Sequence, residues 1–129
     1  MTTQALSAYQ QTSVHTQVEG ASPHKLITML LDGALERTQK AKFAMKNGDV
    51  AAKGELIGRA IDIVGSLDAY LDPEKGGEIA ENLSTLYEYV VLKLFEANSN
   101  NDPNLLDEVV TLLTEIRDGW KGIEGLAED

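Results

Sequence analysis

The segment from residue 77 to residue 98 has more apolar residues than a helix with one buried face can cover. Within Tyr87–Phe95, only Glu88 and Lys93 interrupt a run of apolar side chains. At about 100° of rotation per residue, these side chains point to almost every side of the helix, whereas a surface helix keeps a broad polar face. The pattern therefore predicts a helix that is either buried on two sides or carries an apolar strip for a molecule outside this chain.

Three further helices are predicted over residues 23–47, 50–71 and 103–121, where apolar residues recur at helical spacing. Short loops join these segments to the helix over 77–98, and short loops favour antiparallel neighbours. No stretch alternates apolar and polar residues for long enough to indicate a strand. The sequence therefore predicts an all-α fold, an antiparallel up-down-up-down four-helix bundle spanning residues 22–122.

Local signals mark the predicted helix ends. Ser22-Pro23 and Asp102-Pro103 each place a capping side chain before a first-turn proline, and Asp49 can cap the second helix. Asp72-Pro73 is expected to end the second helix, since the residue before a proline is disfavoured in helical backbone. Gly76-Gly77 is expected to act as a hinge before the third helix.

The two ends of the chain and its charge set further limits. Residues 1–21 are polar and predict a mobile arm, able to form a short capping helix, while the acidic tail at 123–129 is expected to be disordered. There is no Lys or Arg before Lys25 and no long apolar run, so neither an ordinary signal peptide nor membrane insertion is expected. The absence of cysteine favours a cytoplasmic location, and the net charge of −10 would repel a phosphate backbone, so no nucleic acid partner is expected.

Residues that could carry chemistry are few. The histidines, His15 and His24, lie in the arm and in the first turn of a helix, and neither follows a carboxylate by three residues as a di-iron bundle requires. No phosphate-binding glycine loop and no catalytic triad is found. We therefore expect no metal, no cofactor and no enzymatic activity. Histidine phosphotransfer through His24 stays as an alternative, although a solvated first-turn residue is the simpler interpretation.

Six segments, in order along the chain, carry motifs of one known family. They are LSAY at 6–9, ASPHKLITMLLDGAL at 21–35, AIDIV at 60–64, GEIAENLSTLY at 77–87, LFEAN at 94–98 and LLTEIRDGW at 112–120. Together they resemble the flagellin-specific export chaperone family (FliS). His24 departs from the glutamate or glutamine usual in that family, and we expect no change of function from it.

The resemblance implies a four-helix bundle that takes part in type III protein export and bacterial flagellum biogenesis. Such a bundle binds the disordered C-terminal segment of flagellin in apolar grooves, prevents premature polymerisation and delivers flagellin to the flagellar export gate. Leu6 and Tyr9 match positions implicated in docking to the gate protein, and the arm is described as covering part of the groove. An anti-sigma factor is a further partner of some members.

Surplus apolar rows supply the candidate groove, because each bundle helix needs only part of its circumference for its neighbours. An amphipathic client helix would bind such rows through anchors at helical spacing. Each candidate is equally consistent with ordinary helix packing, and a bundle that self-associates as a homodimer stays as an alternative. The candidates are Ile63, Leu67, Tyr89, Leu92, Phe95, Leu105 and Leu112.

Overall fold

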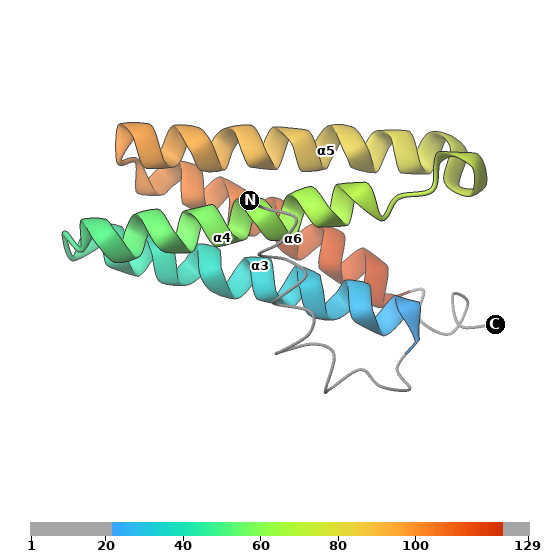
Figure 1. Cartoon of the computed structure of the whole chain (residues 1–129), viewed down its shortest axis with the longest axis horizontal. Coiled ribbons are helices and arrows are strands. Elements are labelled where there is room, and N and C mark those ends of the chain that lie inside the picture. Colours follow the sequence, from blue (N-terminus) through green and yellow to red (C-terminus); the bar gives the residue numbers. More distant parts are fainter. Residues whose placement is uncertain (1–21, 123–129) are drawn as a thin grey trace.

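A computed structural model describes residues 22–122, which form four helices and no strand (Figure 1). The all-α prediction is confirmed. The helices are α3 (Pro23–Lys46), α4 (Val50–Ala69), α5 (Pro73–Asn100) and α6 (Pro103–Gly122). The predicted arm and tail, with Leu6 and Tyr9, lie outside the described residues.

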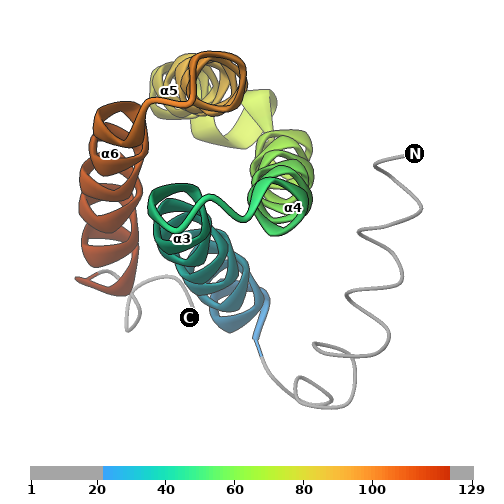
Figure 2. The same cartoon turned by 90° about the vertical axis from the view of Figure 1, so that its left-hand side faces the viewer.

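The four helices surround one core in the order predicted for an up-down-up-down bundle. Helix α3 packs against α4 and α6, and α5 packs against the same two helices. The view along the bundle shows α3 lying diagonally opposite α5, with α4 and α6 on either side (Figure 2). Each helix therefore has two packing neighbours and one side facing solvent.

Capping side chains begin the helices where the sequence places them. Ser22 Oγ accepts a hydrogen bond from the Lys25 backbone N–H at 3.1 Å. Asp49 Oδ1 accepts one from Ala52 at 3.1 Å. Each bond satisfies a backbone donor that has no partner within the helix.

The third bundle helix extends beyond the predicted 77–98 at both ends, but the hinge expected at Gly76-Gly77 is present as a kink at Gly77. Asp72 caps a first turn that begins at Pro73, and α5 continues through a kink at Gly77, whose φ of 54° and ψ of −129° suit only glycine. At the other end, Asn101 adopts the left-handed conformation with φ 53° and ends the helix. The predicted end at residue 98 is two residues early, because Ser99 and Asn100 complete the last turn of α5.

The core is built from one stripe on each helix, at the three- and four-residue spacing expected of a bundle. Leu30, Val64, Leu94 and Leu113 are among the fully buried side chains, one from each helix. The core also takes in Ile63 and Leu67, which are 3% and 2% exposed. Because α4 packs against both α3 and α5, these neighbouring helices cover Ile63 and Leu67.

Candidate functional site

The solvent side of α5 carries exposed apolar residues, which we call the α5 strip: Leu86, Tyr89, Leu92 and Phe95. Leu92 is 52% exposed and Phe95 is 56% exposed, while Val90 and Leu94 on the same helix are fully buried. Helix α5 is therefore not covered on all its apolar sides, because Leu92 and Phe95 lie exposed on its outer face.

The α5 strip winds around the helix. Tyr89 points toward α6, since its hydroxyl donates a hydrogen bond to Glu108 Oε2 at 2.5 Å, which raises the pKa of Tyr89. Leu92 and Phe95 follow at steps of three residues, and each step turns back by about 60° around the helix axis. The apolar surface therefore leads from the α5–α6 edge across the outside of α5 toward α4.

Two predicted groove residues on α6 lie along the same edge as Tyr89. Leu105 and Leu112 are half-buried, and they share the side of α6 on which Glu108 meets Tyr89. Leu105 and Leu112 thus lie on the side of α6 that faces Tyr89, where they also pack against the core, while Leu92 and Phe95 are exposed on the outer face of α5. Ile63 is not part of this surface, and its assignment to an open groove is wrong because it is buried in the core.

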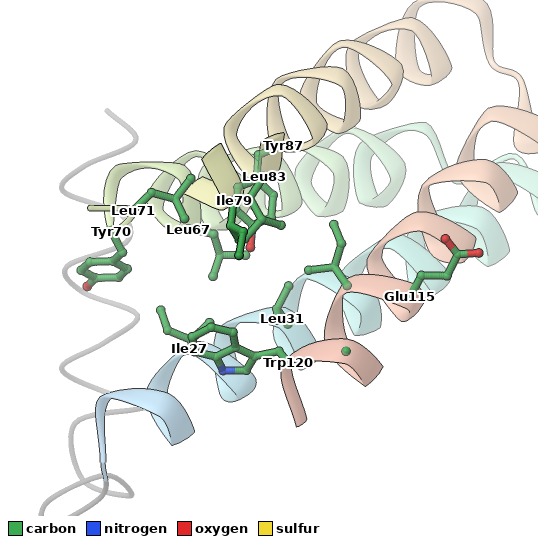
Figure 3. A pocket seen from close by; sticks show the side chains of 12 residues that line it. Ile27, Leu31, Leu67, Tyr70, Leu71, Ile79, Leu83, Tyr87, Glu115 and Trp120 are labelled. Atoms are coloured by element: carbon green, nitrogen blue, oxygen red, sulfur yellow. The ribbon is translucent and has the colours of Figure 1, made fainter. Parts of the chain in front are cut away.

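An apolar pocket of about 370 Å³ lies at the end of the bundle where α3 begins and α6 ends. Figure 3 shows Ile27, Leu31 and Trp120 on one side of this pocket, facing Leu67, Ile79 and Leu83 on the other. Leu67, a predicted groove residue, thus reaches the pocket wall although it is almost fully buried. The lining residues are Ile27, Leu31, Leu67, Tyr70, Leu71, Ile79, Leu83, Tyr87, Glu115, Ile116, Gly119 and Trp120.

Ile79 shows that this end of the bundle is open. It precedes Leu83 and Tyr87 by four and eight residues, a spacing that places all three on the core-facing side of α5. Tyr87 is buried at 3% exposed, yet Ile79 is 72% exposed. A core-facing position is therefore left uncovered by the described residues, and the Ile79 side chain lines the pocket. The apolar pattern gives no sign of this opening, because local spacing does not reveal where neighbouring helices leave a gap.

The pocket is almost free of charge. Glu115 is its single ionisable side chain apart from the tyrosines. Burial raises the pKa of Tyr87 to about 12, and the nearby Asp68 carboxylate adds to the shift, so Tyr87 is neutral at physiological pH. An apolar cavity with neutral walls suits aliphatic or aromatic side chains rather than a charged substrate.

A family model described as flagellar protein FliS matches residues 5–127. This chain belongs to the FliS family. It is 51% identical to the flagellar secretion chaperone FliSB of Pseudomonas aeruginosa over 119 residues, covering 92% of this chain and 94% of that protein. It is 48% identical to FliS of Salmonella typhimurium over 123 residues, covering 95% of this chain and 91% of the relative. FliS of Vibrio cholerae is 44% identical over 119 residues, 92% and 88% of the two chains.

Membership of the FliS family confirms the resemblance found in the motifs, and it makes this chain a flagellar export chaperone. The α5 strip and the pocket therefore belong to a protein whose partner in export is another protein. No helix within residues 22–122 combines the length and apolar character that a membrane crossing needs.

Histidine phosphotransfer finds no support in this FliS-family chain at His24. The expectation of a solvated side chain is wrong, since His24 is 4% exposed and stacks on the ring of Trp120. A phosphate donor could not reach a ring covered in this way. Among the described residues, no group of three or more His, Cys, Asp or Glu is arranged to hold a metal ion.

Proposed function

We propose that this chain binds the disordered C-terminal segment of flagellin in the cytoplasm, prevents its premature polymerisation and delivers it to the flagellar export gate. The observation that carries the proposal is the exposed apolar surface: Leu92 and Phe95 are more than half exposed, and Ile79 borders an apolar pocket. Several exposed apolar side chains on neighbouring turns of one helix form a patch, and such patches favour binding of an apolar partner.

The exposed side chains of α5 and α6 suit an amphipathic helix of the client, and the pocket suits single large apolar side chains of the client. The seam formed by Tyr89, Leu105 and Leu112, continued by Leu92 and Phe95, offers apolar side chains to one face of an amphipathic helix. The pocket offers a place where a few large apolar side chains can be buried. A long client that reaches both regions buries more area, which it needs to offset the entropy lost when it becomes ordered.

Leu6 and Tyr9 remain proposed contacts with the export gate protein, and binding of an anti-sigma factor remains a further proposal. Replacing Tyr9 by alanine should leave flagellin affinity unchanged or improved but reduce export. Normal secretion by this variant would remove Tyr9 from gate docking.

If the arm also covers the apolar surface, deleting residues 1–18 should raise the binding of a hydrophobic dye, and unchanged dye fluorescence would count against that role.

Calorimetric titration of the full chain with about the last 50 residues of a flagellin tests the main proposal. We expect saturable binding with a negative heat-capacity change, the signature of buried apolar area. Sedimentation in the same buffer separates this from the homodimer alternative. A stable dimer that ignores the peptide would support self-association and defeat the chaperone–flagellin assignment.

A further inference from the structure

His24 and Trp120 form a reciprocal contact between the first turn of α3 and the end of α6. The indole Nε1–H of Trp120 donates to the backbone oxygen of His24 at 2.9 Å. The imidazole Nε2 of His24 lies 2.6 Å from the backbone oxygen of Trp120. A carbonyl can only accept, so Nε2 carries the proton. The two rings stack with centroids 4.5 Å apart and planes 8° from parallel.

This contact holds a part of α6 that has little stability of its own. Trp120 lies in the last turn, where the backbone carbonyl oxygens have no N–H donor within the helix. Gly119 and Gly122 flank it, and glycine is the least favourable helix residue after proline. The hydrogen bond from His24 gives one of these terminal carbonyls a partner, so His24 acts as a side-chain cap on a neighbouring helix.

His24 is held in this position at a cost. Its side chain is buried at 4% exposed, and its Nδ1 has no hydrogen-bond partner among residues 22–122. A buried polar atom without a partner is unfavourable, and an apolar residue would fill the same space without that penalty. The side chain is therefore better explained by what its Nε2–H and ring do to Trp120 than by core packing.

Trp120 links the contact to the pocket. It is a wall residue, and it stands beside Ile27 and across from Ile79 and Leu83 (Figure 3). Because the indole is part of the wall, a change in its orientation would change the width of the pocket at this end. His24 is not a lining residue, so it can influence the pocket only through Trp120.

We propose that His24 is the positioning residue of the client pocket: it fixes the Trp120 indole as a wall and so controls client affinity without touching the client. This inference rests on the proposed function, because it assigns the pocket to the flagellin segment. It predicts that removing the Nε2–H donor weakens binding by more than any accompanying loss of stability explains.

The test compares His24→Ala and His24→Gln in the full chain, with Lys53→Met as the matched control. Lys53 Nζ donates to the backbone oxygen of Asn98 at 3.3 Å, so it also caps a helix end, but at the opposite end of the bundle from the pocket. Affinity for the C-terminal flagellin segment is measured by calorimetry at moderate salt. Stability is measured by urea unfolding. Trp120 is the one tryptophan in the chain, so its emission reports directly on the contact.

We expect His24→Ala to weaken binding by about tenfold and to shift the emission of Trp120 to longer wavelength, as the indole leaves its stack. Glutamine can donate to the same carbonyl, so His24→Gln should stay within about threefold of the wild type. Lys53→Met should lose stability but keep its affinity. If His24→Ala does not fold, His24→Asn takes its place, because asparagine has the same amide but is too short to bridge to Trp120.

Three results would overturn the inference. Wild-type affinity in His24→Ala would show that the contact does not shape the pocket. Equal losses in His24→Gln and in the alanine or asparagine variant would show that the donor is irrelevant. A loss of affinity in Lys53→Met as large as in His24→Ala would reduce the effect to general destabilisation. If the wild-type chain itself fails to bind the segment, the proposed function falls as well, and that result is distinct from the other three.

Discussion

Leu92 and Leu94 are the same residue type on the same helix, two positions apart, and they differ almost completely in exposure. Leu92 is 52% exposed and Leu94 is 0% exposed. Replacing each by alanine therefore separates the two uses of apolar residues on α5. Leu94→Ala removes a core side chain, whereas Leu92→Ala removes half-exposed apolar area that we assign to the client.

The expected magnitudes follow from these exposures. Full burial of a leucine side chain is worth about 1.5–3 kcal/mol, so covering the exposed 52% of Leu92 is worth about 0.8–1.6 kcal/mol of binding free energy. Leu92→Ala should then weaken client binding by about four- to fifteenfold. Its cost to the free energy of unfolding should be less than about 1 kcal/mol, while Leu94→Ala should cost about 2–5 kcal/mol.

Urea unfolding and calorimetric titration with the C-terminal flagellin segment measure the two quantities on the same preparations. In thermal unfolding, Leu94→Ala should lower Tm by about 8 °C or more, and Leu92→Ala by only a few degrees. Wild-type affinity in Leu92→Ala would refute the assignment of the α5 strip to the client. A stability loss as large as that of Leu94→Ala would place Leu92 in the core and refute the burial argument itself.

Three further predictions concern the bundle. The pKa of Tyr87 is raised to about 12 in the folded chain and is about 10 when unfolded, so between these pH values the unfolded state has lost a proton that the folded state keeps. Stability should fall by up to about 3 kcal/mol as the pH rises through this window, and urea midpoints of Tyr87→Phe should fall much less. Gly77→Ala should lower the free energy of unfolding by about 1–3 kcal/mol, because φ is 54° at that position. Gly58→Ala inside α4 should be neutral or stabilising, because an added Cβ meets nothing within 4 Å there. Equal urea midpoints for the two variants would contradict this prediction. Ser22→Ala should cost about 1 kcal/mol through loss of the bond to Lys25 N–H, and an unchanged midpoint would show that the cap contributes nothing.

The helices could be predicted from the sequence because their signals are local. Helical spacing of apolar residues and the caps at Ser22 and Asp49 depend only on near neighbours in the chain, and the structure confirms both caps. Asp72-Pro73 is expected to end the second helix, but α4 already ends at Ala69, and Asp72 instead caps a first turn of α5 that precedes the kink at Gly77. Local signals show that a helix boundary is near, but not whether they end one helix or begin the next.

The candidate surface could be predicted only in part. Ile63 and Phe95 are both large apolar residues that the sequence offers as groove candidates. Ile63 is 3% exposed, whereas Phe95 is 56% exposed. The difference depends on which side of each helix its neighbours cover, and that is a property of the whole bundle. The same holds for Ile79, whose core-facing position gives no sign that the bundle is open there. His24 is buried against Trp120, 96 residues away, and nothing near His24 in the chain indicates that contact.

The central claim is that apolar surface left uncovered by this bundle receives the C-terminal segment of flagellin. Side-chain NMR of the chain with and without that segment tests it most directly. We expect the largest signal changes at Leu92, Phe95, Ile79 and Trp120, and small changes at buried Leu30. Changes confined to the outer face of α3 around Gln39 and Lys40, or no changes at all at saturating peptide, would contradict the claim.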